Sequence, residues 1–427
     1  MNIFACLATR ATAVLPLALL AAGLYFGVLL RFFPFLHPRR VWRALQKGGK
    51  TARRSTMLAL AGTVGVGNIA GVALAISAGG PGALFWMWIC AFAAMMLKYA
   101  EITLSMAHRT AGGGGTPYVM QAVGLPRLGR LFALLCLAYT LLVGGAVQAN
   151  AVSECLLDGL SLSPLVSGLI LIGLTLPVIL GGASRISALT AKLVPLMCRL
   201  YVAASLAVIV ANRTALPGAI MQVLREAFTP AAAAGGGLGF LSARALRVGA
   251  ARGLMSNEGG CGTAPMAHAV SQEKSPARQG LFGIVEVFVD TTLLCTLTAL
   301  ALLTTLPALP AGVGGVSLVR LAFSTVFGRA AGSLLALLLF FFAYATVLCQ
   351  AFYGRVCTES MTSARPAQAL YSLAFCGALL AGALGTPALV WQACDILLAI
   401  MTLCNLFLLL RERKTILLLT KEEGFLD

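Results

Sequence analysis

Eleven long apolar segments dominate this 427-residue chain and constrain its fold more than any other feature. A helix needs about 20 apolar residues to cross the hydrocarbon core of a bilayer. Charged residues make up only 11% of the sequence, whereas a soluble domain carries roughly 25%, so the sequence predicts an all-α integral membrane protein. The predicted spans cover about residues 12–32, 57–77, 82–107, 131–157, 164–182, 188–211, 240–268, 279–305, 328–352, 367–386 and 389–410.

The chain is strongly basic, with a formal net charge of +17. Its Lys and Arg residues lie between apolar spans rather than on the face of a soluble domain, which argues against a nucleic-acid partner. Residues 31–54 carry eight of them, and cytoplasmic loops are enriched in Lys and Arg. We therefore expect this loop and the C-terminal tail in the cytoplasm, the N-terminus outside, and the protein in the cell inner (plasma) membrane.

Twelve cysteines and three histidines are present, but their spacing does not indicate a metal centre. Most of the cysteines lie in apolar runs without a C-x-x-C pair, and each histidine lies near the end of a span. Small buried side chains are expected rather than a zinc site or a disulfide framework. We therefore expect no bound cofactor, and no obligate protein partner is evident.

Two of the predicted spans are interrupted by glycine. The second contains GTVGVGNIAG at 62–71, and the seventh contains GLMSNEGGCGTAP at 253–265. Each glycine costs roughly 1 kcal/mol relative to alanine in a helix, and backbone groups freed at membrane depth are tolerated only where they line a cavity or are buried in protein. The two segments are therefore predicted to be broken helices that present backbone N–H and C=O groups near the middle of the membrane.

Five predicted spans begin with the first interrupted one, and five more begin with the second. Because five is odd, the second set must enter from the opposite side, which gives an inverted repeat with a binding site between the two breaks. The predicted organisation is a peripheral N-terminal helix with a basic loop, a first repeat, an external connection, a second repeat and a cytoplasmic tail, at 1–56, 57–211, 212–239, 240–410 and 411–427.

The half-helix ends at the first break offer two kinds of binding group. Backbone amides around Gly65, Gly67 and Asn68 carry partial positive charge and suit a carboxylate. The carbonyls of Ala61 and Val64 suit a bare cation such as sodium. Close helix packing through paired small residues is the alternative, whereas a dinucleotide-binding loop would need a preceding strand that is absent.

Uncharged polar side chains lie inside two other predicted spans. In the fourth span, Gln148 and Asn150 either donate to a substrate carboxylate or bond a neighbouring helix, and for Gln148 the residues alone do not decide between the two. In the ninth span, Thr346 can bond its own helix, but Gln350 lies one turn later on the same face. That spacing favours a polar cavity beside this face.

Acidic side chains in or beside spans are further candidates for a transport path, because ionisable groups at membrane depth usually serve function. Glu101 follows Lys98 by three residues, and we expect these two to form a local pair. The acidic residues concerned are Glu101, Glu154, Glu258, Glu286, Asp290 and Asp395.

These segments resemble the alanine or glycine:cation symporter family of bacteria and archaea, from about residue 20 to about residue 410. The longest similar stretches are GTVGVGNIAGVALAISAGGPGALFWMWICAFAAMMLKYAE at 62–101 and ARGLMSNEGGCGTAPMAHAV at 251–270. Shorter ones are VQANAV at 147–152, FAYATVL at 342–348 and CDILLAIMTLCNL at 394–406.

The resemblance implies a leucine-transporter-like fold and sodium- or proton-coupled uptake of a small neutral amino acid such as alanine or glycine, without enzyme activity. Thr346 matches a hydroxyl that lies beside the coupling cation. The residues that match the family's substrate-contacting motifs come from the two broken helices and two further spans: Gly65, Gly67, Asn68, Gln148, Met255, Ser256, Asn257 and Thr346.

Three departures from the family's usual pattern bear on the site. Ala345 replaces one hydroxyl of a Ser-Thr pair, Gln350 replaces a cavity tryptophan, and Met255 replaces a frequent phenylalanine. We expect Gln350 to line the site and to admit a more polar substrate, such as serine or glutamine, because its amide offers a donor and an acceptor.

A secondary symporter is the function that these features favour. The alternative is a non-transporting membrane sensor or receptor related to the symporters, which the lost hydroxyl at Ala345 would fit. An integral membrane enzyme is disfavoured, because no nucleophile and base, and no set of metal ligands, converge at one depth.

Overall fold

The computed structural model describes residues 3–110, 113–228, 244–306, 310, 313, 315–385 and 388–426. Regular structure within these ranges is helical throughout, in agreement with the predicted all-α class. Seven helices of the described part are long and apolar enough to cross a membrane, or eight when a bent pair is counted as one span. Two shorter apolar helices, Leu15–Leu29 and Pro164–Leu180, accompany them.

Every predicted apolar segment is mainly helical in its described residues, with non-helical backbone at the two breaks. In chain order, the corresponding helices are α1 (Ile3–Leu29), α4 (Lys50–Thr63) with η1 (Val66–Asn68) and α5 (Ala70–Gly79), α6 (Ala83–Ala107), α8 (Pro126–Tyr139) with η2 (Thr140–Val147) and α9 (Gln148–Leu160), α10 (Pro164–Leu180), α11 (Gly182–Ala211), α15 (Arg244–Asn257) with α16 (Ala264–His268), α17 (Pro276–Val287) with η4 (Phe288–Cys295) and α18 (Thr296–Thr305), α20 (Ala331–Met361), α21 (Arg365–Leu384) and α22 (Ala388–Arg411).

Shorter helices connect or follow these. They are α2 (Phe33–Leu36), α3 (Pro38–Lys47), α7 (Thr116–Ala122), η3 (Arg213–Ala215), α12 (Leu216–Ala227), α19 (Gly315–Phe327), η5 (Gly328–Ala330) and α23 (Arg413–Glu422). Some boundaries differ from the prediction: α4 begins at Lys50 rather than near residue 57, and α20 runs to Met361 rather than 352. Apolar character ends where hydrocarbon ends, whereas backbone hydrogen bonding can continue beyond it, so hydropathy underestimates the length of these helices.

Both predicted breaks are confirmed. The segments Lys50–Thr63 and Val66–Gly79 are bent by 65° relative to each other. In the second broken span, α15 ends at Asn257 and α16 begins at Ala264. The backbone between them has positive φ at Glu258, Gly260 and Gly262, with values of 50°, 82° and 81°, a conformation that glycine adopts without strain.

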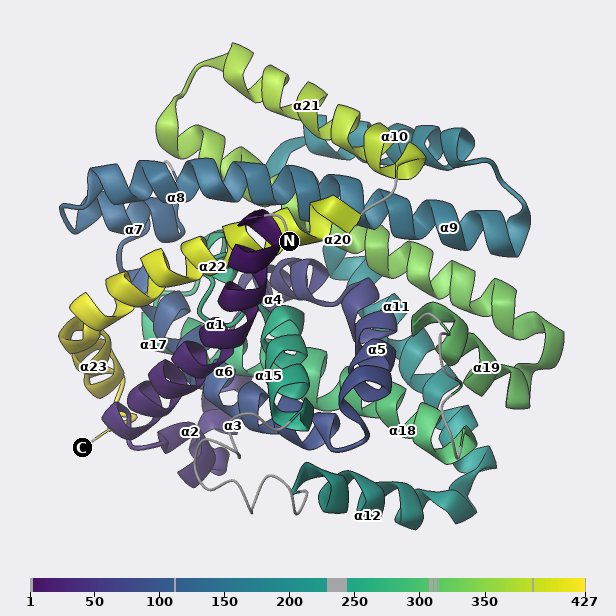
Figure 1. Ribbon diagram of the computed structural model, residues 1–427. Coiled ribbons are helices and arrows are strands. Elements are labelled where there is room, and N and C mark those ends of the chain that lie inside the picture. Colours follow the sequence, from purple (N-terminus) through teal and green to yellow (C-terminus); the bar gives the residue numbers. More distant parts are fainter. Residues whose placement is uncertain are drawn as a thin grey trace.

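The helix α6 lies at the centre of the molecule (Figure 1). Of its most apolar window, 78% is buried, against 33% for α21, which lies beside α10 at one edge. The helix α17 packs closely on α6, since a methyl group added at Gly283 would overlap the Ile102 side chain. Small residues at such crossings allow helices to pack tightly in membranes.

Contacts between connecting segments define two opposite ends of the molecule. At the basic end, formed by α2, α3 and α23, Arg40 Nη1 donates to the Gly424 carbonyl at 3.2 Å. At the α12 end, Trp86 Nε1 donates to the Ala227 carbonyl at 3.1 Å. The first turn of α15 also lies at the α12 end, because Leu246 packs against Trp86.

A fully buried charged network joins four helices between the breaks and the basic end. The ammonium of Lys98 on α6 pairs with Glu286 Oε1 on α17 at 2.8 Å. Glu286 Oε2 lies 3.2 Å from His268 Nε2 on α16, and His268 Nδ1 accepts from Gln279 Nε2 at 2.7 Å. Gln279 Nε2 also donates to Ser55 Oγ on α4 at 3.0 Å. The network therefore connects α4 and α16, one half of each broken helix, to the α6–α17 pair.

The predicted local pair of Lys98 with Glu101 is wrong. Glu101 Oε2 instead accepts from the Gly262 N–H at 3.1 Å and from Asn405 Nδ2 at 2.9 Å. Residues three apart on a helix can meet, but Lys98 faces α17, where the Glu286 carboxylate is buried in the packed interior. The Glu286 carboxylate is shielded from water, and its attraction for Lys98 outweighs a local helix pair, which contributes only a few tenths of a kcal/mol.

Replacing Lys98 with Met should destabilise the protein by about 3–5 kcal/mol, because Glu286 would remain buried without its cation. The measurement is the melting temperature of the purified protein, with Lys47→Met, a change at an exposed lysine, as the control. Adding Glu286→Gln to Lys98→Met should recover part of the loss. Equal melting temperatures for Lys98→Met and Lys47→Met would contradict the assignment of this ion pair.

Candidate functional site

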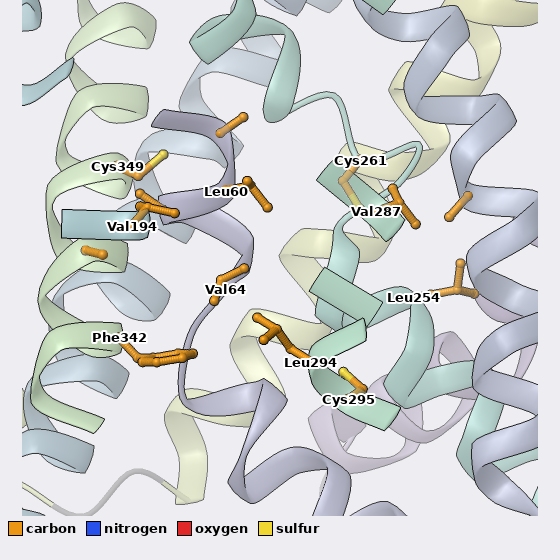
Figure 2. Packing of buried hydrophobic residues seen from close by; sticks show 14 of the residues in the cluster. Leu60, Val64, Val194, Leu254, Cys261, Val287, Leu294, Cys295, Phe342 and Cys349 are labelled. Atoms are coloured by element: carbon orange, nitrogen blue, oxygen red, sulfur yellow. The ribbon is translucent and has the colours of Figure 1, made fainter. Parts of the chain in front are cut away.

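The first break creates free backbone groups between α4 and α5. In an unbroken helix the Gly65 N–H would bond the Ala61 carbonyl, but here it donates to Asn68 Oδ1 at 2.9 Å. The Ala61 carbonyl is thereby released at the end of α4. Figure 2 shows Val64 at this end, with Phe342 of α20 to one side and Leu294 of η4 to the other, so packed apolar side chains surround the break.

The Asn68 side chain connects the first break to the second broken helix. Its Nδ2 donates to Asp290 Oδ1 at 2.8 Å and lies 3.2 Å from Ser256 Oγ. Ser256 Oγ donates to Asp290 Oδ2 at 2.8 Å. Asn68 is fully buried and does not line the cavity described below. The structure thus places this side chain between the two breaks, and the predicted contact of Asn68 with substrate stays a prediction.

Asn257 holds the second break together from within. Its Oδ1 accepts from the Gly259 N–H at 2.9 Å, and its Nδ2 donates to the Gly253 carbonyl at 2.7 Å. It is fully buried and does not line the cavity, and its predicted contact with substrate stays a prediction. The side chain of Met255, the next predicted contact on this helix, lies outside the described residues.

A cavity of about 870 Å³ lies against both breaks. Its lining runs from buried residues at the breaks to the exposed Ser77, Ala78 and Arg244, so it opens to the surface at the α12 end. Five of the predicted site residues line it: Gly65, Gly67, Gln148, Ser256 and Thr346.

Three of these residues, from three separate helical elements, meet at the first break. A methyl group added to Gly65 would lie 2.9 Å from Thr346 Oγ1 and 4.0 Å from Gln148 Oε1. Thr346 Oγ1 donates to the Phe342 carbonyl at 3.1 Å, which leaves its lone pairs directed outward from α20. Gln148 Oε1 is buried without a hydrogen-bond partner among the described residues. At the break, the oxygen atoms of Thr346 and Gln148 therefore lie beside the bare backbone of Gly65, where a ligand can reach them.

The sequence model of the sodium:alanine symporter family matches residues 3–422. The chain belongs to this family. It is accordingly a cation-coupled amino-acid transporter and not an enzyme.

Relatives of this family cover most of the chain. An uncharacterized transporter of Haemophilus influenzae is 36% identical over 95% of this chain and 92% of its own. The sodium/alanine symporter AgcS of Methanococcus maripaludis is 36% identical over 84% of this chain and 80% of its own. The probable sodium/glutamine symporter GlnT of Bacillus subtilis is 31% identical over 91% and 83%.

Solved structures of more distant transporters share the fold. MhsT in complex with L-phenylalanine superposes with a TM-score of 0.55 at 13% identity, covering 82% of this chain and 87% of its own. A mutant of the Eremococcus coleocola manganese transporter gives a TM-score of 0.55 at 14% identity, over 86% and 78%. At these identities the likeness concerns the fold alone.

Gln350 does not lie where the sequence of this symporter suggested. Its side chain is fully buried and packs against Gly144 in the π-helical turn η2, away from the cavity lining. Neither of its amide atoms has a hydrogen-bond partner among the described residues. A methyl group added at Gly144 would overlap the Gln350 side chain, so this glycine of η2 makes room for it.

Several functional candidates escaped the sequence analysis or were left without a role. Tyr139 lines the cavity and donates to Glu258 Oε1 at 2.8 Å, yet nothing in its sequence context distinguishes it. Asp290 carries the signal of a buried charge: it accepts from Asn68, Ser256 and Thr291, and no described cation lies within ion-pair distance. The oxygen atoms of such a carboxylate are ligands that suit a hard cation.

The remaining acidic residues divide by position. Glu258 and Asp395 line the cavity, Glu101 and Glu286 belong to buried networks, and Glu154 is exposed on α9.

The open backbone at Gly67 should be essential for uptake. Nothing lies within 4 Å of a methyl group added there, and Gly67 lines the cavity, so Gly67→Leu should abolish uptake by filling the cavity while Gly67→Ala retains most of it. Uptake of labelled alanine into cells with equal membrane levels of each variant tests this. Normal uptake by Gly67→Leu would refute a binding site at the break.

Proposed function

We propose that this protein is a secondary active symporter that couples inward sodium flow to the uptake of a small neutral amino acid such as alanine or glycine. The observation that carries the proposal is the convergence of Gly65, Gln148 and Thr346 at the buried end of the cavity. The relatives support both kinds of ligand, sodium and an amino acid, since they include a sodium/alanine symporter and a probable sodium/glutamine symporter.

The substrate carboxylate fits the first break. The amides of Val66 and Gly67 at the start of η1 donate to no group of the described chain, and amides at such a half-helix start favour negative charge. The Gln148 amide faces the same end of the cavity and supplies a side-chain donor. A small substrate is expected, because these groups lie close to the Thr346 side chain.

The coupling cation fits the other side of the same break. The Ala61 carbonyl is released there, Val64 directly follows the last residue of α4, and the Thr346 hydroxyl lies beside Gly65. Carbonyl and hydroxyl oxygens at an unwound helix end suit sodium. Asp290, one hydrogen bond behind the break through Asn68, supplies a compensating negative charge.

We further propose eleven membrane crossings arranged as a five-plus-five inverted repeat, with the basic end in the cytoplasm. Alternating crossings from the loop 31–54 put both this loop and the C-terminal tail on one side, and the Arg40–Gly424 contact places them together. The same alternation puts α12 and the Ala83 end of α6 outside, where Trp86 meets Ala227. On this orientation the cavity opens to the outside of the plasma membrane.

The direct test is uptake of labelled alanine by purified protein in proteoliposomes, with and without an inward sodium gradient. Sodium-driven accumulation supports the symporter, and competition by the twenty amino acids defines the substrate. Alanine binding without accumulation would instead favour the sensor or receptor. Uptake driven by a proton gradient instead of sodium would reassign the coupling ion; one relative is named as a putative sodium/proton-dependent alanine carrier protein.

Gln148→Ala should raise the apparent KM for the substrate by about tenfold, because a hydrogen bond to a charged group contributes about 1.5–3 kcal/mol. Asn150→Ala is the matched control: the same change two residues on, where the amide donates to the Gly385 carbonyl at 2.9 Å instead of facing the cavity. Initial uptake rates against substrate concentration give both values. An unchanged KM in Gln148→Ala would leave Gln148 as a helix-packing residue.

Thr346→Val should raise the sodium concentration for half-maximal uptake several-fold, since it keeps the side-chain shape and removes one cation ligand. A lost oxygen ligand comparable to one hydrogen bond of about 1 kcal/mol predicts roughly a fivefold shift. Thr304→Val, which removes a hydroxyl that bonds its own helix in α18, is the control. If the sodium dependence of Thr346→Val equals that of the wild type, Thr346 is not a cation ligand.

A further inference from the structure

The part of the cavity between the breaks and its mouth contains charges that the proposed symport site does not use. Three arginines of α15 line the cavity, Arg244, Arg247 and Arg252. The first two are exposed at the mouth, whereas Arg252 is half-buried. Arg252 precedes Ser256 by four residues, so it lies about one helical turn, roughly 6 Å, above the second break.

Asp395 of α22 faces the same part of the cavity. It is half-buried and lines the cavity together with its neighbours Cys394 and Leu398. The Arg252 guanidinium and the Asp395 carboxylate have opposite charges and attract each other electrostatically. Nevertheless, within the described ranges neither side chain forms a hydrogen bond or an ion pair, so their charged atoms are more than 4 Å apart.

An unpaired cation and an unpaired anion across one half-buried cavity are unfavourable unless a ligand or water satisfies them. An amino acid carries both complementary groups, a carboxylate and an ammonium, on one carbon atom. Arg binds carboxylates with two parallel hydrogen bonds, and a carboxylate such as Asp395 accepts from an ammonium. The gap between these two side chains therefore has the charge pattern of an amino-acid zwitterion.

We propose that Arg252 and Asp395 form an outer subsite for the α-amino-acid zwitterion, in which Arg252 binds the carboxylate and Asp395 binds the ammonium group before the substrate moves to the break. This inference rests on the proposed symport function and deepens it. The outer subsite recognises the carboxylate and ammonium groups that all α-amino acids share. The deeper site at the break, beside Gly65 and Thr346, selects substrates by the size of their side chain. Simple amines and simple carboxylates satisfy only one side of the outer subsite.

The subsite predicts an effect on capture rather than on final affinity. Charges that line a cleft raise the association rate of a ligand with complementary charge by factors of about 10 to 1,000, and salt weakens this effect. Arg252→Gln and Asp395→Asn should each lower the initial uptake rate at substrate concentrations far below KM by about tenfold. Equilibrium alanine binding to the purified variants should change by less than about threefold, because the residues at the break are intact.

The experiment measures uptake into proteoliposomes and equilibrium binding of labelled alanine, each at low and high choline chloride with sodium held constant. Arg213→Gln is the control for net charge, since Arg213 is exposed in η3 at the same end and does not line the cavity. Arg252→Lys keeps the charge and should retain at least half of the low-concentration rate. It also keeps the test valid if Arg252→Gln fails to fold, which the melting temperature reports.

Three outcomes decide the matter. Slow, salt-insensitive capture with intact binding in Arg252→Gln and Asp395→Asn supports the outer subsite. Wild-type capture in these variants overturns it, and so does a loss of equilibrium binding as large as that in Gln148→Ala, which would place both charges in the deep site. Failure of the wild-type protein to bind or accumulate any amino acid is a different result, and it rejects the proposed function instead.

Discussion

The structure depends on satisfying backbone and carboxylate groups that two broken helices expose deep inside a membrane protein. Asn68 meets this requirement at the centre: its Oδ1 accepts the displaced Gly65 amide, and its Nδ2 donates to Asp290. Ser256 of the second broken helix bonds the same carboxylate. One amide thus connects both breaks and the π-helical turn η4. In hydrocarbon, where no water competes, such bonds determine which irregular backbone is tolerated.

The charged network of Lys98, Glu286 and His268 has a related role on the other side of the breaks. It joins α4 and α16, the inner halves of the broken helices, to the packed pair of α6 and α17. Toward the α12 end there is an open cavity, and toward the basic end there are filled contacts. On the closed side, α4 and α16 are therefore held by polar bonds between residues far apart in the sequence. Any opening at this end must break these bonds or move the bonded helices together.

The sequence predicts the breaks well and the side-chain roles unevenly. Glycine acts on its own backbone, so the breaks at 62–71 and 253–265 are visible locally. The partner of Lys98 is 188 residues away, and which face of α6 meets α17 cannot be obtained from spacing within one helix. The same limit explains Asn68, whose position in a motif is local but whose bonds to Asp290 and Ser256 are not. Gln350 packs against Gly144 in the π-helix η2, and the local sequence pattern does not predict a π-helix there.

The charges along the cavity suggest why two ligands are bound together. The groups that meet at the break, from Gly65, Gln148 and Thr346, bring no formal charge. A zwitterion there places its carboxylate beside the cation site, and each ligand reduces the cost of burying the other's charge. With one sodium ion and one zwitterion bound as proposed, the site would carry one net positive charge, and Asp290 lies behind it, linked through Asn68, without an ion-pair partner in the described ranges. A site built from neutral groups in front of one buried carboxylate therefore favours full loading over partial loading, and that preference is the physical basis of coupling.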